Sequence, residues 1–151
     1  MSRRLGYGIL VTTFLLIMAI SLLKPGLISN KNTFLLGFVN HEFLNLLGVI
    51  IAITLASAGQ IHLSLNQIEE KSKKEGFHET RKGLRVAIKW LIGLFMLGLI
   101  LVIIKPLIPN CDKNEILHAI INGTAVFIVI WYILIMYSMT EAVFAIKPQI
   151  E

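Results

Sequence analysis

The sequence predicts an all-α integral membrane protein that crosses the membrane four times. Of its 151 residues, 56% are hydrophobic and only 15% are charged, and the mean hydropathy is +0.77. A soluble domain is usually about half apolar and about a quarter charged. The apolar excess is concentrated in four long stretches. This composition excludes a soluble enzyme, a disordered tail and a secreted disulfide scaffold.

The four predicted spans form one domain and cover residues 7–23, 43–65, 84–104 and 116–146. Each is near the ~20 residues that cross ~30 Å of hydrocarbon as a helix. The first two carry no formal charge, the third carries Arg85 and Lys89 only near its start, and the fourth is uncharged until Glu141. Backbone groups in lipid must be satisfied internally, and no stretch alternates as a barrel strand does, so we expect helices.

The second span is preceded by a further apolar segment, residues 34–39. A single helix over 34–65 would be roughly 48 Å long, which is too long for one upright span. We therefore expect residues 34–39 to lie along the outer membrane interface, with a break near Asn40.

The distribution of Lys and Arg predicts the orientation, because cytoplasmic flanks carry the excess of positive charge. If the N-terminus is cytoplasmic, ten basic residues lie inside and four lie outside. The outer four are Lys24, Lys31, Lys105 and Lys113. Both termini and the 66–83 hairpin are thus expected in the cytoplasm.

Two segments resemble each other and suggest an internal repeat. The first span ends in the sequence LLKPGLISN (22–30) and the third in IIKPLIPN (103–110). A His-x3-Asn pair then opens the second span and again the fourth. Two interpretations stay open: two duplicated helical hairpins related by an axis along the membrane normal, or generic punctuation after a span together with a coincidence.

These pairs define a predicted polar cluster at the outer ends of the spans, consisting of His41, Glu42, Asn45, His118 and Asn122. At i,i+4 spacing, each His and its Asn share one helix face. The cluster has four interpretations: interhelical hydrogen bonding, a polar lining for an ion path, a haem held by His41 and His118, or a metal site that adds Glu42. Plain hydrogen bonding with interfacial anchoring explains the residues without a ligand, and no metal-ligand spacing is present.

A second predicted surface lies on the second span, where small residues repeat along one face. Its members are Gly48, Ala52, Ala56, Gly59 and Gln60. Small residues let backbones approach closely, and a glutamine can hydrogen-bond across the contact. We expect the second span to be central, packed against a sister helix or another subunit.

The third candidate surface is the basic cytoplasmic hairpin, whose basic residues are Lys71, Lys73, Lys74, Arg81, Lys82 and Arg85. These side chains can face anionic lipid or a cytoplasmic protein partner. We expect the helices to continue past the bilayer into the segment 66–85, with a turn near Gly76. At 20 residues this segment is too small to be an enzyme or a nucleic-acid-binding domain alone. We predict no catalytic residues, no metal and no cofactor, and the single cysteine, Cys111, excludes an intramolecular disulfide.

Residues 47–49 (LGV), 54–58 (TLASA) and 65–69 (LNQIE), followed by the basic hairpin, resemble the small four-span membrane subunits of bacterial anti-phage systems. The membrane protein of the Kiwa system (KwaA type) is similar, and so is that of the Rex exclusion system. The resemblance covers topology over most of the chain. It implies an oligomeric inner-membrane protein that works with a cytoplasmic partner, and it assigns no site residue.

Two functions are therefore expected. The first is a non-enzymatic, homo-oligomeric inner-membrane scaffold or sensor, with a role in phage defence, which recruits a cytoplasmic effector through its basic hairpin. The alternative is a small pore or ion-leak effector, with the polar cluster at its outer mouth.

Overall fold

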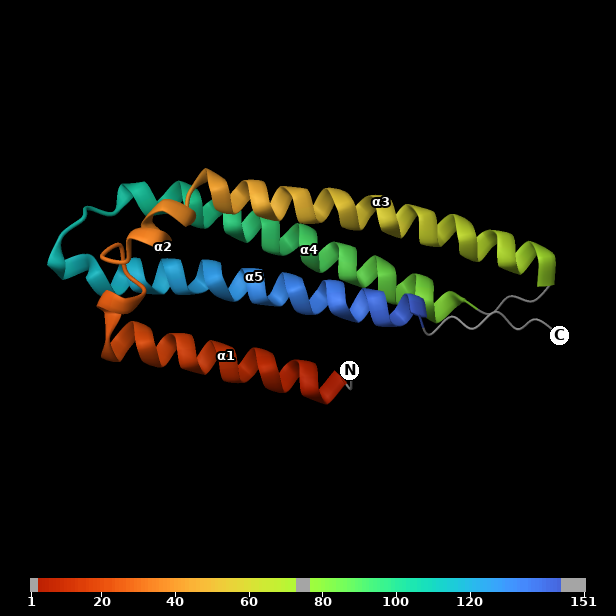
Figure 1. Cartoon of the computed structure of the whole chain (residues 1–151), viewed down its shortest axis with the longest axis horizontal. Coiled ribbons are helices and arrows are strands. Elements are labelled where there is room, and N and C mark those ends of the chain that lie inside the picture. Colours follow the sequence, from red (N-terminus) through yellow and green to blue (C-terminus); the bar gives the residue numbers. More distant parts are fainter. Residues whose placement is uncertain (1–2, 73–76, 145–151) are drawn as a thin grey trace.

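The computed structural model describes residues 3–72 and 77–144, and within these ranges it is all-helical (Figure 1). These ranges contain five α-helices, in the order α1 (Arg3–Leu23), α2 (Thr33–Phe38), α3 (His41–Ser72), α4 (His78–Ile104) and α5 (Glu115–Phe144). Three short 3-10 turns, η1 (Pro25–Leu27), η2 (Lys105–Leu107) and η3 (Asp112–Asn114), lie between them. The fold class predicted from composition is confirmed.

Four helical stretches among the described residues are long and apolar enough to span a membrane: Leu5–Leu23, His41–Lys71, His78–Leu107 and Asp112–Glu141. The second and third are longer than the predicted spans, because residues 66–72 and 78–83 of the hairpin are helical and continue α3 and α4, as expected. The turn expected near Gly76 lies outside the described residues. The last two residues of the predicted fourth span lie outside the described residues. Since the chain crosses the bundle four times, its first and last described residues lie at the same end (Figure 1).

Within the described part of this single chain, the fourth span, α5, is the central helix and the second span, α3, is not. α5 packs against α1, α3 and α4, while α1 packs chiefly on α5. In the most apolar part of each span, 39% of residues are buried for α5 and 11–17% for the other three. Both the bundle interior and the lipid are apolar, so hydropathy alone does not reveal which helix is surrounded.

Small residues set the close approach of α5 to α1. A Cβ added at Gly123 would lie 2.6 Å from Cγ2 of Ile17 on α1, closer than side-chain atoms pack. On the other side of α5, Tyr132 is fully buried and its hydroxyl donates a 2.7 Å hydrogen bond to the carbonyl oxygen of Leu91 on α4. Phe43 and Leu47 of α3 complete this core.

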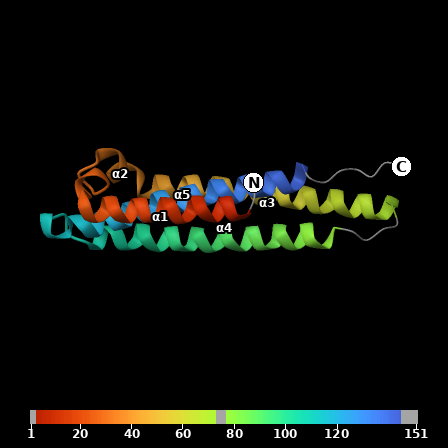
Figure 2. The same cartoon turned by 90° about the horizontal axis from the view of Figure 1, so that it is seen from below.

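The segment 24–40 folds over one end of the bundle and carries α2 (Figure 2). The side chain of Asn32 caps the start of α2 by accepting a 3.2 Å hydrogen bond from the amide of Leu35. At its other end the buried Nζ of Lys105 donates to the carbonyl oxygens of Leu35 and Val39, at 3.3 and 3.0 Å. α2 ends at Phe38 and α3 begins at His41, so the predicted break near Asn40 is confirmed.

Candidate functional site

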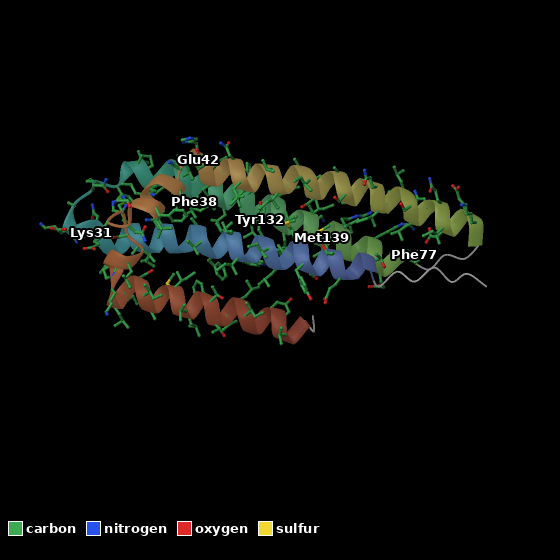
Figure 3. The ribbon with its side chains drawn as sticks, in the orientation of Figure 1. Lys31, Phe38, Glu42, Phe77, Tyr132 and Met139 are labelled. Atoms are coloured by element: carbon green, nitrogen blue, oxygen red, sulfur yellow. The ribbon has the colours of Figure 1, made fainter. Side chains whose placement is uncertain are left out.

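The predicted polar cluster is divided in the structure. The side chains of His41 and Glu42, at the start of α3, are 77% and 63% exposed, and Asn45 is exposed as well. His118 and Asn122, on α5, are 3% and 0% exposed. Figure 3 shows Glu42 on the outer side of α3, away from the bundle interior. The two His-x3-Asn pairs therefore have different environments despite their equal spacing.

His118 and Asn122 are held by the segment that links α1 to α2. The Nδ2 of Asn30 lies 3.0 Å from Nδ1 of His118, and its Oδ1 accepts a 3.3 Å hydrogen bond from Nδ2 of Asn122. Asn122 Nδ2 also donates to the carbonyl oxygen of Ile28 at 3.0 Å. The other ring nitrogen of His118 lies 3.4 Å from the carbonyl oxygen of Pro109. This network joins α5 to the α1–α2 and α4–α5 linkers, and it is called the outer lock below after the side of the membrane predicted for these linkers.

The sequence did not identify Asn30 and Asn110, although the internal repeat contains them. Each asparagine ends its copy of the Lys-Pro motif, and Nδ2 of Asn30 donates a 2.7 Å hydrogen bond to Oδ1 of Asn110. The lysines of the two copies differ, because Lys24 is exposed and Lys105 is buried. The duplication itself stays a prediction.

A polar cleft of about 390 Å³ lies beside the outer lock, between the two outer linkers and the start of α5. Lys31 crosses its edge and forms ion pairs with Glu115 at 2.8 Å and with Asp112 at 3.5 Å. The hydrogen bond to the Glu115 carboxylate, strengthened by the charges of both acids, raises the pKa of Lys31 above its usual value of 10.5. Ser29 also donates to Glu115, at 3.5 Å. Sequence patterning could not find these pairs, because they join residues 84 and 86 positions apart.

The arrangement of the outer lock favours interhelical hydrogen bonding over ligand binding. His41 is exposed on α3, and both ring nitrogens of the buried His118 lie against protein partners, so the two histidines do not form a facing pair for haem. Over residues 3–72 and 77–144, no group of three His, Cys, Asp or Glu side chains could hold a metal ion. The division of the cluster also leaves no single ring of four residues to line a pore within one chain.

The small-residue face of α3 is not covered by the described part of the same chain. Ala52, Ala56, Gly59 and Gln60 are exposed, and only Gly48 is partly buried. A Cβ added at Gly59 would meet no described atom within 4 Å. The buried side of α3 instead carries Phe43, Leu47, Thr54, Ala58 and Leu65. A sister helix therefore does not occupy this face, and packing against another subunit stays a prediction.

The basic hairpin contains one structural arginine and several exposed cations. Arg81 on α4 forms a 2.5 Å ion pair with Glu69 and a 2.6 Å hydrogen bond with Asn66, both on α3. Glu69 also accepts a 3.3 Å hydrogen bond from the amide of Phe77. Lys71, Lys82 and Arg85 are exposed, and Lys73 and Lys74 lie outside the described residues. Arg81 thus clamps the two helices and is not available to bind a partner.

Comparisons with known proteins gave no match: no protein family, curated protein or solved structure is similar enough to assign this chain. The resemblance to anti-phage membrane subunits consequently stays a prediction.

Proposed function

We propose that this chain is a non-enzymatic, homo-oligomeric scaffold or sensor of a bacterial inner membrane, and that it recruits a cytoplasmic effector protein through the α3–α4 hairpin. The observation that carries the proposal is the clamped extension of this hairpin. α3 has 32 residues, or roughly 48 Å of helix, against ~30 Å of hydrocarbon. The part of α3 that exceeds the hydrocarbon thickness carries charged residues and continues as a helix beyond the apolar stretch.

The Arg81 clamp supports recruitment over simple lipid binding. A loop that only touches anionic headgroups needs positive charge but no fixed geometry. In this hairpin, Arg81 holds Glu69 and Asn66 in place while Lys71, Lys82 and Arg85 remain exposed around them. A preorganised surface of this kind lowers the ordering cost of binding a protein. The anti-phage resemblance adds phage defence as the proposed setting.

Charge reversal tests recruitment. The variant Lys82→Glu/Arg85→Glu changes two exposed residues of the hairpin, and the matched control Lys24→Glu/Lys113→Glu changes two exposed residues at the opposite end. Each tagged protein is purified from membranes of the source cells, and co-purifying soluble proteins are quantified by mass spectrometry. We expect one cytoplasmic protein to be lost from the hairpin variant and kept by the control. If the same proteins accompany both variants, recruitment through the hairpin is wrong.

Membrane potential separates the scaffold from the pore alternative. A scaffold expressed without its effector leaves the potential unchanged, because no conducting path is formed. A chain that collapses the potential when expressed alone is instead a pore. The same cells also allow the topology to be checked. The charge-reversal experiment can be interpreted only if the termini are cytoplasmic, so a tag at either terminus must be inaccessible from outside the cell.

A further inference from the structure

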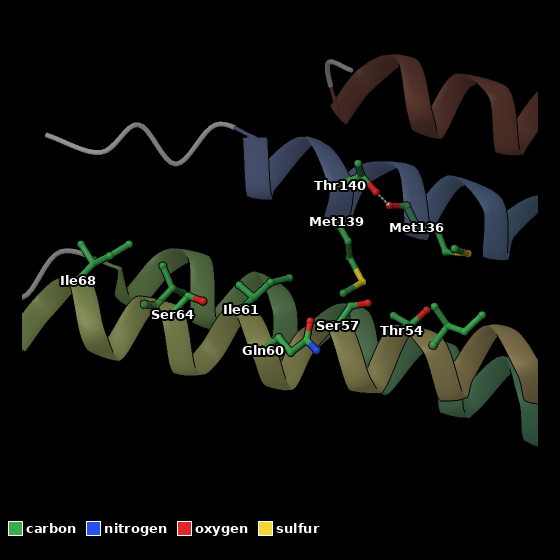
Figure 4. Close-up of a pocket in the computed structure, with 11 residues that line it drawn as sticks. Thr54, Ser57, Gln60, Ile61, Ser64, Ile68, Met136, Met139 and Thr140 are labelled. Carbon is green, nitrogen blue, oxygen red and sulfur yellow. Dashed lines mark hydrogen bonds between the residues drawn. The ribbon is translucent and has the colours of Figure 1, made fainter. Parts of the chain in front are cut away.

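A groove with a volume of about 560 Å³ lies between α3 and α5, in the half of the bundle nearer the termini (Figure 4). α3 contributes the stretch from Ile53 to Ile68, and α5 contributes Met136, Met139 and Thr140. Met139 extends from α5 toward Ser57 on α3 (Figure 4). The groove lies within the candidate membrane spans, and its lining contains no charged residue.

Three polar side chains in this groove have no hydrogen-bond partner among the described residues. Ser57, Gln60 and Ser64 follow i,i+3,i+7 spacing, so they lie on one face of α3, and all three are exposed. The two threonines of the groove differ from them. Thr54 donates a 2.7 Å hydrogen bond to the carbonyl oxygen of Ile50, and Thr140 donates a 2.9 Å hydrogen bond to that of Met136. The serines and the glutamine are therefore the groups that lack partners.

These three residues fall inside the second predicted span, 43–65. A hydroxyl or amide that faces acyl chains loses its hydrogen bonds with water and gains none from lipid. A polar stripe at bilayer depth therefore requires a cover that supplies hydrogen bonds.

The chemistry of the groove identifies the cover. With no cation in its lining, the groove offers nothing to pair with the phosphate of a lipid headgroup. Serine and glutamine side chains each carry donors and acceptors, so the stripe is complementary to a second copy of itself. Beside it, the exposed Ala56 and Gly59 leave space for another backbone to approach.

We propose that the α3–α5 groove receives α3 of a second copy of this chain, so that the two polar stripes hydrogen-bond across a two-fold axis. The interface is isologous, because each copy presents the same stripe and the same groove. This inference rests on the proposed homo-oligomeric scaffold and specifies which surface joins its subunits.

Cysteine cross-linking tests the location of the interface. Cys111 is the sole cysteine of the sequence and is exposed near the outer linkers, so it is first replaced by serine. Ser57→Cys and Ser64→Cys are then compared, in native membranes under oxidising conditions, with Leu15→Cys on the exposed face of α1. A disulfide requires Cα atoms within about 7 Å. We expect covalent dimers from the α3 variants only. Equal yields from all three variants, or no dimer from any, would overturn the inference.

Gln60→Leu tests the hydrogen bonds themselves. Because Gln60 is exposed, each chain of the variant is expected to fold normally. Dimerisation is expected to weaken roughly three- to tenfold, as measured by the dimer fraction in native mass spectrometry. A wild-type chain that is monomeric and holds lipid in the groove contradicts the proposal.

Recruitment of the cytoplasmic protein is measured in parallel with dimerisation. Lost recruitment with intact dimers contradicts the proposed function, whereas absent dimers with intact recruitment contradict only this inference.

Discussion

At the scale of single residues, the outer lock shows how one spacing leads to two environments. His41 and Asn45 have the same i,i+4 spacing as His118 and Asn122, yet only the second pair is buried. The difference comes from Asn30, which is 88 residues from His118 in the sequence. Local spacing predicted that each pair shares a helix face, and it could not reveal which pair a distant linker covers.

Replacing Asn122 by leucine is expected to destabilise the bundle by about 1–2 kcal/mol. The change removes the hydrogen bonds to Ile28 and Asn30 and leaves two partly buried acceptors without this donor. The loss is at the lower end of the usual range because Oδ1 of Asn122 has no partner in the structure, so its burial cost disappears too. Thermal unfolding in a mild detergent measures the effect.

Asn45→Leu is the matched control, since Asn45 is exposed and has the same position relative to its histidine. We expect a change within about 0.5 kcal/mol. If both variants lose stability equally, the outer lock is not what distinguishes the two pairs.

At the scale of elements, hydropathy was a good guide to the number of spans and a poor guide to their neighbours. The break near Asn40 was predicted from the length of the apolar run 34–65 and is present, yet α3 itself has 32 residues, so length alone does not decide where a helix ends. The central place of α5 could not be predicted, because lipid-facing and buried positions are both apolar in a membrane protein. The helical extensions of α3 and α4 were expected from another signal, the helical spacing of Ile61, Leu65 and Ile68, which continues beyond the apolar stretch.

The Arg81 clamp gives a prediction for one of these extensions. In Arg81→Met the ion pair with Glu69 and the hydrogen bond with Asn66 are lost, and both are partly shielded from solvent. We expect amide hydrogen exchange in residues 78–85 to become roughly tenfold faster, while the membrane-embedded part of α4 is unchanged. Arg85→Met removes an exposed cation from the same helix and serves as the control. Equal acceleration in both variants would contradict a specific role of Arg81.

At the scale of the whole molecule, the structure establishes that both described ends of the chain lie at one end of the bundle, and the charge distribution predicts which side this is. Ten basic residues accompany the termini and the α3–α4 hairpin, against four at the outer linkers. Two of those four are already engaged in the structure: Lys31 with Glu115, and Lys105 with the end of α2. Arg81 on the hairpin side is likewise paired, with Glu69, so the predicted orientation rests on the count of Lys and Arg itself.

Cys111 allows this orientation to be measured directly. It is exposed in the linker before η3, so a membrane-impermeant maleimide added to intact spheroplasts is expected to label it. In a Cys111→Ser chain, Lys82→Cys places the label on the hairpin instead, and it is expected to react only after the membrane is permeabilised. The opposite pattern would place the hairpin outside the cell, where no cytoplasmic effector could reach it. The orientation is thus the one property of the whole molecule on which recruitment through the hairpin depends.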